Sequence, residues 1–450
     1  MISLRDYQSS AVGAVREAMR TGGRRVVLVL PTGAGKTRTG AAIVERAVMR
    51  KSRVVWLAHR TELIEQTAKS LHEHGLPVGV VAASSAWPID PSAPVQVCSV
   101  QTLLARDARP PADLLVWDEC HHASESAPAW AAILAAYQEV RTLGLTATPE
   151  RGDGSGLEPI FDRLVVGVTV RELTEQGHLV PCEVSRPGHL LKPGQLAREP
   201  LEAYQADAPR QQGFLFAKSV DEARRYADEF SAAGIRSVCV HAGTKSEERA
   251  VSIELFRQGV IRILCNVYVF TEGTDLPMAQ VCILARGAST AGIFLQMVGR
   301  VLRPHRGKSK AMLIDLRGVT HVHMMPEDER HFSLTGKGIS CGSDLAKCKV
   351  CGSALDVGYP CATCKYAPDA GDGANDGSVI VDEPMVKYAR FIAQSDAQKE
   401  ETCERWIRAA LIKNHNPRSV VHKWTAVYQS PPDPSMFARA LKRAMDGRAA

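Results

Sequence analysis

The segment from residue 31 to residue 37 has the composition of a phosphate-binding loop. It reads PTGAGKT and lies between an apolar run, VVLVL, and a stretch with a helical pattern. Glycines in such a loop let backbone N–H groups surround a polyphosphate at a helix N-terminus, a lysine adds charge near the β- and γ-phosphates, and a hydroxyl ligates magnesium. Leu30 replaces the first glycine of the strict pattern. A tight glycine turn that binds nothing is the alternative, but the flanking strand and helix favour a binding loop made of Thr32, Gly33, Ala34, Gly35, Lys36 and Thr37.

A pair of adjacent carboxylates ends a second apolar run. Asp118 and Glu119 follow LLVW and begin the sequence DECH. At the carboxyl end of a buried strand, one carboxylate can ligate a metal ion while the other aligns or deprotonates a water molecule. Such pairs are common and often only solvated, so the assignment depends on the phosphate-binding loop upstream. We expect Thr37 and Asp118 to hold magnesium and Glu119 to act as the base.

Cysteines crowd towards the C-terminal part of the chain. Four of the twelve form two Cys-x-x-Cys pairs, Cys348 with Cys351 and Cys361 with Cys364. In a reducing compartment such crowding favours metal binding over disulfides, and four thiolates so spaced can complete a tetrahedral zinc site. The intervening loop is shorter than in the commonest double pattern. A redox dithiol is the alternative, but two pairs in one short segment make it less favourable, and we expect one structural zinc ion.

Apolar runs alternate with stretches of helical length on both sides of a proline-rich segment. One set (VVLVL, VVWLA, VQVCS, LLVWD, TLGLT) lies in residues 24–148 and the other (GFLFA, RSVCV, IRILC, VCILA, AMLIDL) in residues 212–318. This rhythm predicts parallel sheets covered by helices. Ser219 and Glu222 have the spacing of a capping box at the start of a helix running towards Gly234. The fold class is therefore α/β with two tandem parallel-sheet domains, and the expected segments are a first domain at 1–172, a connector at 173–211, a second domain at 212–335, a zinc-knuckle module at 336–366, a flexible linker at 367–382 and a basic helical tail at 383–450.

The composition is that of an ordinary globular protein. Of 450 residues, 45% are hydrophobic and 23% are charged, which excludes disorder and collagen-like repetition as descriptions of the whole chain. No run approaches the roughly 18 apolar residues of a membrane span, and the first residues lack a signal-peptide pattern, so we expect a cytoplasmic protein without a membrane partner. The net charge of +6 lies mostly in residues 383–450, where twelve basic residues stand against seven acidic ones. A polyanion partner and a solvated helical surface explain this excess equally well.

The order of the motifs resembles that of the superfamily-2 DExH helicases. Besides PTGAGKT and DECH, the sequence contains LTATP at 145–149, TEGTD at 271–275 and QMVGRVLR at 296–303. The resemblance covers about residues 4–316 and is greatest for the RadD-like and XPB-like group of DNA translocases, many of them bacterial or phage-encoded. It implies two RecA-like domains that hydrolyse ATP, with magnesium, to move along or unwind DNA in repair, recombination or replication.

The same resemblance implies roles for single residues. Gln8 in LRDYQ matches the glutamine that hydrogen-bonds adenine, although an ordinary helix-surface glutamine is the alternative. Gly273 and Asp275 match positions near the ribose and phosphates, and Thr146 and Thr148 match the motif that couples hydrolysis to nucleic acid. An arginine delivered from the second domain stabilises the transition state only when the cleft closes. The expected catalytic set is Lys36, Asp118, Glu119, His121 as a bridge to the second domain, Arg300, and Arg303 as the preferred γ-phosphate finger.

Similar enzymes hold one nucleic-acid strand across both domains, mainly by its phosphates. Polar residues just past strand ends are candidate contacts, because open α/β sheets bind ligands there. For each of them alone, a helix-cap or turn role fits equally well. Arg306, Lys308 and Lys310 likewise fit phosphate contact and a solvated loop equally well. The candidates are His59, Arg60, Gln101, Thr102, Lys218, Ser219, His241, Gly243, Thr244 and Thr271.

Two other functions fit the sequence as alternatives. One is a nucleic-acid-binding clamp or scaffold in which ATP closes the domains without strand separation, and the other is an RNA helicase. The intact DECH sequence and both motif arginines favour an active ATPase, whereas none of these residues distinguishes DNA from RNA. We expect single-stranded or branched DNA as the partner, and we regard the C-terminal tail as a candidate site for protein partners.

Overall fold

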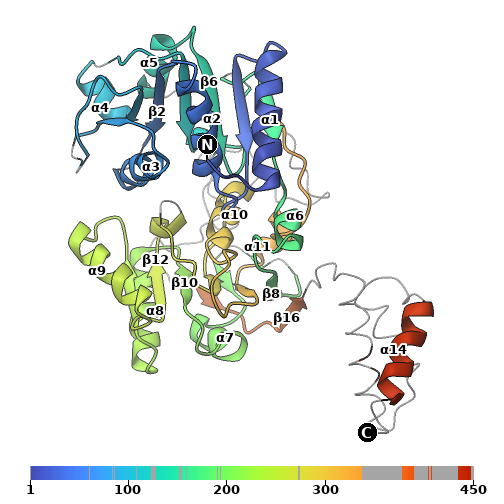
Figure 1. Ribbon diagram of the computed structural model, residues 1–450. Coiled ribbons are helices and arrows are strands. Elements are labelled where there is room, and N and C mark those ends of the chain that lie inside the picture. Colours follow the sequence, from blue (N-terminus) through green and yellow to red (C-terminus); the bar gives the residue numbers. More distant parts are fainter. Residues whose placement is uncertain are drawn as a thin grey trace. The chain divides into compact units, whose positions relative to one another are not determined.

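The computed structural model divides into two compact units, Met1–Tyr388 and Ala389–Ala450 (Figure 1). The first unit contains two α/β domains, and in the second the structure describes the helix α14 (Pro434–Asp446). No helix in the described part of the chain is long and apolar enough to cross a membrane. The structure describes residues 2–59, 61–83, 85, 87–107, 109–122, 128–151, 155–158, 160–189, 191–192, 194–271, 274–336, 378–389, 404, 407 and 434–446.

The first domain is built on a seven-stranded parallel sheet. Its strands are β1 (Arg25–Val29), β2 (Val54–Ala58), β3 (Val78–Val81), β4 (Val95–Ser99), β5 (Leu114–Asp118), β6 (Arg141–Thr146) and β7 (Arg163–Val166). Its helices are α1 (Asp6–Arg20), α2 (Lys36–Val48), α3 (Thr61–Glu73), α4 (Val100–Ala105), α5 (Pro128–Ala136) and the 3₁₀ turn η1 (Cys120–His122). The order β3-β4-β2-β5-β6-β1-β7 places the five runs predicted from the sequence in the centre. The strands β3 and β7, which were not predicted, form the edges.

The second domain contains a sheet of the same size. Its strands are β8 (Cys182–Pro187), β10 (Gly213–Phe216), β11 (Ser237–Val240), β12 (Ile263–Asn266), β13 (Val281–Leu284), β14 (Ala311–Asp315) and β16 (Met385–Ala389), in the order β11-β12-β10-β13-β14-β8-β16. Its helices are α7 (Pro200–Asp207), α8 (Val220–Ala232), α9 (Ser246–Arg257), α10 (Ala291–Gly299), α11 (Val319–His323) and the 3₁₀ turn η2 (Val269–Thr271). The segment between the domains includes α6 (Val170–Glu175). Two parallel-sheet domains in tandem are the fold class expected from the sequence.

Two strands of the second sheet lie outside the range 212–335 expected for that domain. β8 falls within the expected connector and pairs in parallel with β14. β16 falls at the start of the expected helical tail and lies beside β8. Just before it, β15 (Val379–Ile380) pairs with β9 (Gln195–Leu196) in a small separate sheet. β9 and β15 have two residues each, and β8 and β16 contain or adjoin proline and charged residues, so their pattern does not stand out in the sequence.

The predicted start of α8 is confirmed, but only half of its capping box forms. Ser219 Oγ accepts a hydrogen bond from Glu222 N at 3.2 Å. The carboxylate of Glu222 does not return to Ser219; it accepts from Lys218 N at 3.3 Å and from Ser378 N and Oγ, both at 2.8 Å. Glu222 therefore anchors the segment that precedes β15 to the second domain.

After helix α11 the chain returns to the first domain. Leu334 O accepts a hydrogen bond from Glu158 N at 2.9 Å, and Phe332 and Leu334 pack against a buried apolar cluster that includes Trp117. A Cβ atom added at Gly156 would lie 1.9 Å from Leu334 O, so the return segment passes too close for any side chain there. This return segment ties the second domain to the first, in addition to the segment that contains α6.

Candidate active site

The phosphate-binding loop connects β1 to α2, as the sequence predicts. Gly33 and Gly35 have φ values of +91° and +78°, in the left-handed region that favours glycine. A Cβ atom added at Gly33 would lie 2.9 Å from Leu179 Cδ2, and one at Gly35 would lie 2.7 Å from Gln8 Nε2. Both glycines are therefore required by backbone conformation and by packing. Lys36 is the first residue of α2, so the loop presents a helix N-terminus suited to phosphate.

Helix α1 braces this loop from one side. Tyr7 OH and Gln8 Nε2 both donate to Ala34 O, at 2.9 and 3.1 Å, and Gln8 Oε1 accepts from Arg5 N at 3.0 Å. Gln8 is only 2% exposed. The structure thus places Gln8 against the loop, while Arg5 and His178 line the adjacent cleft. Tyr7 and Arg5 belong to the LRDYQ segment, but their types and positions in the sequence alone predict no role for them.

A cleft of about 450 Å³ opens between the two domains at this loop. Most residues predicted for nucleotide binding and catalysis line it. Gln8, Ala34 and His121 are not among its lining residues, and Gly273 lies outside the described part of the chain. The predicted residues that line the cleft are Thr32, Gly33, Gly35, Lys36, Thr37, Asp118 and Glu119 from the first domain, and Asp275, Arg300 and Arg303 from the second.

The two carboxylates occupy different environments at the end of β5. Asp118 is buried, and this burial, together with the charge of Glu119 and against the opposing charge of Lys36, raises its pKa to about 7. Glu119 has a φ of +49°, which is unusual for a residue with a side chain. Strained backbone conformations of this kind occur most often at functional sites. Its Oε1 lies 3.4 Å from Lys36 Nζ. Glu119 therefore faces the phosphate-binding loop, whereas Asp118 is held deeper.

The residues present fit a magnesium ion. Thr37 and Asp118 both line the cleft and supply a hydroxyl and a carboxylate oxygen. Mg²⁺ in such sites takes one or two protein oxygens and completes its shell with phosphate and water. A positive ion there would also favour the charged form of Asp118. Among the described residues no group of three or more His, Cys, Asp or Glu side chains is placed to hold a metal, and the four predicted zinc ligands lie outside those residues.

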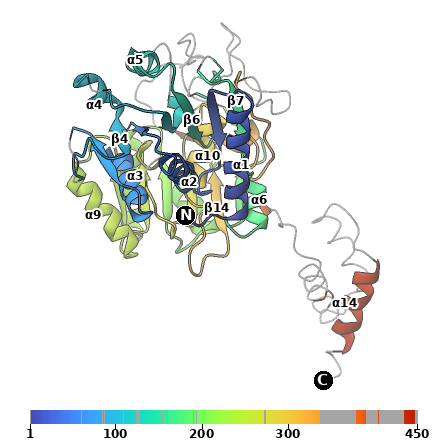
Figure 2. The ribbon, with the colours of Figure 1, turned by 45° about the horizontal axis from the view of Figure 1, so that its top comes forward.

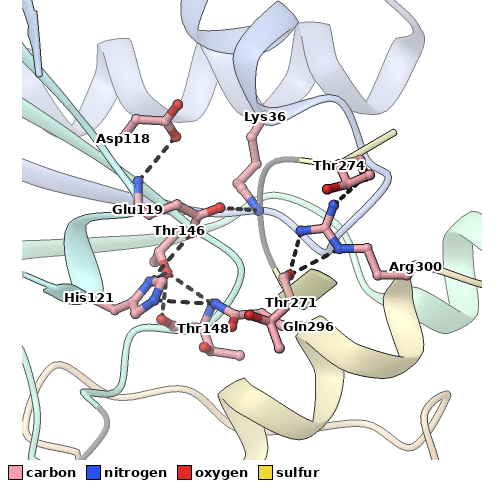
Figure 3. Close-up of polar contacts among 10 residues, drawn as sticks. All are labelled: Lys36, Asp118, Glu119, His121, Thr146, Thr148, Thr271, Thr274, Gln296 and Arg300. Atoms are coloured by element: carbon pink, nitrogen blue, oxygen red, sulfur yellow. Dashed lines mark hydrogen bonds and ion pairs between the residues drawn. The ribbon is translucent and has the colours of Figure 1, made fainter. Parts of the chain in front are cut away.

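His121 links the hydrolytic residues to the second domain. Its Nδ1 lies 3.0 Å from Thr146 Oγ1 and 3.4 Å from Glu119 Oε2, and its Nε2 lies 3.2 Å from Gln296 Nε2 on α10 (Figure 3). Thr146 Oγ1 in turn donates to Thr148 O at 2.6 Å. These contacts place His121 between the residues around Glu119 and helix α10. Gln296 was noted in its motif but given no role, and it supplies the second-domain end of that bridge.

Helix α10 lies at the boundary of the two domains in Figure 1, and it lies behind the first domain in Figure 2, where that domain comes forward. A Cβ atom added at Gly292 would lie 2.5 Å from Thr148 Oγ1, and one added at Gly299 would lie 2.6 Å from Thr32 Cβ. Gly292, Gln296 and Gly299 are four and three residues apart and share one helix face. The two glycines therefore let this face approach the first domain closely enough for Gln296 to reach His121.

The two motif arginines have different surroundings. Arg300 is 8% exposed, and its guanidinium donates to Thr271 O at 3.0 Å from Nε and to Thr274 O at 2.8 Å from Nη1. Arg303 forms an ion pair with Asp275. A Cβ atom added at Gly33 would lie 3.4 Å from Cγ of Arg303. Arg300 thus holds the loop after η2, while Arg303 lies against the phosphate-binding loop.

Most of the candidate nucleic-acid contacts also have local partners. The hydroxyl oxygens of Ser99 and Ser219 cap helices by accepting hydrogen bonds from Thr102 N and Glu222 N. Thr244 Oγ1 closes the turn at His241 by accepting from His241 N at 2.9 Å. Gly243 N donates to His241 Nδ1 at 3.1 Å, Gln101 Nε2 donates to His59 O at 3.4 Å, and Thr271 Oγ1 donates to Tyr268 O at 2.8 Å. Arg60 lies outside the described residues. These contacts position the segments and leave their role towards nucleic acid untested.

The basic residues after Arg303 differ in their surroundings. Lys308 is buried and donates to Pro277 O at 3.1 Å and Ala279 O at 2.5 Å, and burial lowers its pKa to about 7. Lys310 pairs with Glu183 at 2.7 Å. Both side chains therefore serve internal contacts, whereas Arg306 is exposed.

Known proteins match both domains of this chain. Residues 1–151 match the family described as "Type III restriction enzyme, res subunit", and residues 196–305 match "Helicase conserved C-terminal domain". A 51.5 kDa protein of Lactococcus phage (isolate 7-9) is 30% identical over 66% of this chain and 66% of its own length. The Saccharomyces cerevisiae protein named as the ATP-dependent helicase IRC3 is 27% identical over 71% of this chain, which spans about half of that protein (52%). The DNA 3'-5' translocase XPB2 of Sulfurisphaera tokodaii is 26% identical over 70% of this chain and 81% of its own length.

A solved structure shares the fold. It is a fragment named as the HsdR subunit of a type I restriction enzyme from Vibrio vulnificus YJ016, with a TM-score of 0.58 over 74% of this chain and 67% of that chain. The sequence identity is 19%, so the likeness concerns the architecture. That architecture is a tandem of two RecA-like parallel-sheet domains.

Proposed function

The chain belongs to superfamily 2 of the helicases, and from this membership we propose that it is an ATP-driven DNA translocase or helicase of the RadD-like and XPB-like group. The observation that carries the proposal is the series of contacts from Lys36 through Glu119 and His121 to Gln296. This series joins the phosphate-binding loop to a helix of the second domain. A change at the nucleotide can therefore shift the equilibrium between two arrangements of the domains.

In the proposed reaction, the loop amides and Lys36 hold the triphosphate of ATP. Magnesium, held by Thr37 and Asp118, supplies positive charge that neutralises the phosphate oxygens. Glu119 accepts a proton from a water molecule whose oxygen attacks the γ-phosphorus, while the bond from that phosphorus to the β–γ bridging oxygen breaks. ADP and inorganic phosphate are the products. Gln8 near the adenine and Gly273 and Asp275 near the ribose and phosphates remain parts of this proposal.

We infer that DNA is the nucleic acid that this motor uses. The inference is supported by the names of XPB2, a DNA translocase, and of the restriction-enzyme proteins that share sequence or fold with this chain. The experiment is ATP hydrolysis measured with single-stranded DNA, duplex DNA, forked DNA and RNA at equal nucleotide concentration. We expect stimulation by DNA alone. Stimulation by RNA alone would identify an RNA helicase, and DNA stimulation without translocation or strand separation would identify a clamp.

The C-terminal unit is expected to add electrostatic affinity for DNA. Each phosphate neutralised contributes roughly 0.9 to the slope of log affinity against log salt on duplex DNA and ~0.7 on single strands. Removing the basic residues after Ala389 should therefore flatten the slope, as measured by fluorescence anisotropy over a range of salt. Truncation after Ala389 keeps β16, whereas truncation at the expected boundary, residue 383, would remove a strand of the second sheet. An unchanged slope and affinity would mean that the tail charge is only solvated.

We also propose that Cys348, Cys351, Cys361 and Cys364 bind one structural zinc ion. Four thiolates leave no open coordination position for water, so the ion would stabilise folding and take no part in hydrolysis. Replacing Cys361 and Cys364 by Ser should release the metal without removing basal ATP hydrolysis. Elemental analysis of the purified protein is the measurement. A protein without bound zinc or iron would contradict the proposal.

A further inference from the structure

Tyr268 has an unusual conformation directly after β12. Its φ is +57°, which is strained for an aromatic residue, and it is 39% exposed. The guanidinium carbon of Arg286 lies 3.4 Å from the centre of its ring, and Arg286 Nη2 donates to the Tyr268 hydroxyl. Arg286 is only 1% exposed, and its Nε donates to Gly287 O at 3.0 Å. A buried cation therefore fixes a strained, partly exposed tyrosine ring through one of its faces.

This ring lines a cavity of about 230 Å³ between the two domains. Thr271 and Ile293 line the cavity from the second domain, and His122 and Thr148 line it from the first. Gln296 lines both this cavity and the nucleotide cleft, and its partner His121 also lines the cavity. Gln296 therefore borders both this cavity and the nucleotide cleft, and it contacts His121.

The chemistry of the cavity suits an uncharged planar group better than a phosphate. Among its lining residues Glu150 is the one carboxylate, and there is no lysine or arginine. Thr148 Oγ1 is buried and has no hydrogen-bond partner among the described residues, so a polar atom is available to an occupant. A tyrosine, a buried hydroxyl without a partner among the described residues, and a lining without lysine or arginine suit a nucleobase better than a sugar–phosphate backbone.

We propose that Tyr268 stacks on a base of single-stranded nucleic acid that enters this cavity. The inference rests on the proposed function and goes beyond it, because the expected track across both domains holds phosphates. Stacking on one ring tolerates every base, since each base has a π-face. A base must leave the duplex to reach the cavity, so this contact selects single-stranded over paired nucleic acid. Strain at Tyr268 is of the kind that persists where a functional geometry requires it.

The test compares the full-length protein with Tyr268→Leu, which loses the ring, and with Tyr268→Phe, which keeps it. Binding is measured to a single-stranded thymidine oligonucleotide and to an abasic oligonucleotide of the same length. Losing one stacked base should weaken binding of the thymidine oligonucleotide by about 5- to 100-fold in Tyr268→Leu. Its affinity for the abasic strand should equal that of the wild type, and Tyr268→Phe should match the wild type on both strands.

Three outcomes separate the possibilities. Equal affinity of Tyr268→Leu and wild type for the thymidine oligonucleotide would overturn the inference. So would an equal loss on both strands, because a structural role of the ring would weaken base-containing and abasic DNA alike. If the wild-type protein binds neither strand and no nucleic acid stimulates its ATPase, the proposed function fails instead. The wild-type protein is therefore measured before any variant is compared with it. Thermal unfolding of each variant verifies that it is folded.

Discussion

Glu119→Gln is expected to bind ATP but to hydrolyse it at least ~10²-fold more slowly than the wild type. The amide keeps the size of the side chain but cannot accept the proton of the attacking water. Glu119 Oε1 lies 3.4 Å from Lys36 Nζ, so the substitution removes a carboxylate that already faces the phosphate-binding loop. The rate is measured as kcat of ATP hydrolysis with saturating DNA, and binding by calorimetry with ATP.

Two further variants make this result specific. Lys36→Ala should lose most ATP affinity or turnover, because it removes the positive charge near the β- and γ-phosphates. Glu73→Gln is the matched control, since Glu73 lies on α3, is 61% exposed and pairs with Lys69 at 3.9 Å. This control should behave as the wild type in both assays. A kcat for Glu119→Gln close to that of the control would show that another group takes the proton.

The apolar runs of the sequence predicted five strands of each sheet, including β11 at one edge of the second sheet, but missed β3, β7, β8 and β16. Runs such as VVLVL and LLVWD are buried on both faces, so they are uniformly apolar and easy to recognise. The strands β7 and β16 lie at edges and are partly exposed, so they mix charged and apolar residues. β8 is an interior strand, but it ends with Pro187 in a stretch whose composition is that of a connector. Local composition reports burial, so the partly exposed edge strands β7 and β16 were missed.

The motif residues were predicted individually, whereas the contacts between domains were not. Lys36, Asp118 and Arg303 were identified because each motif is short and continuous, and the cleft brings them together. The close approach of α10 depends on Gly292 and Gly299, whose meaning appears only once Thr148 and Thr32 lie opposite them. In the sequence these glycines are weak positions in a short helix. Their tertiary neighbours explain why a residue without a side chain is needed there.

The arrangement of the two arginines assigns them different parts of the catalytic cycle. Arg300 donates to the carbonyl groups of Thr271 and Thr274, so it is committed to the loop of its own domain. Arg303 makes one longer hydrogen bond, to Thr274 O at 3.4 Å, and pairs with the carboxylate of Asp275, whose side chain is 72% exposed. An exposed ion pair of this kind contributes little stability, so its exchange for a phosphate partner costs little. Arg303 is therefore the arginine that can change partners when nucleotide binds.

Arg303→Ala should abolish the stimulation of ATP hydrolysis by nucleic acid, with a loss of about 10³-fold or more in stimulated turnover. The loss follows because the guanidinium comes from the second domain and approaches the phosphate-binding loop beside Gly33. ATP binding should persist, since Lys36 and the loop glycines belong to the first domain. Arg303→Lys should not restore the rate, because an ammonium cannot bridge two phosphate oxygens as a planar guanidinium does.

The control for this variant is Arg257→Ala. Arg257 lies in the last turn of α9, is 48% exposed and pairs with Glu254 in the same helix, so it should leave both binding and turnover unchanged. Stimulated turnover is measured with single-stranded DNA, and nucleotide affinity is measured separately in the absence of DNA. If Arg303→Ala and Arg257→Ala hydrolyse ATP equally fast with DNA present, then Arg303 does not reach the γ-phosphate. A loss of ATP affinity equal to the loss of turnover would instead assign Arg303 to ground-state binding, because only a contact made in the transition state lowers kcat without weakening the bound nucleotide.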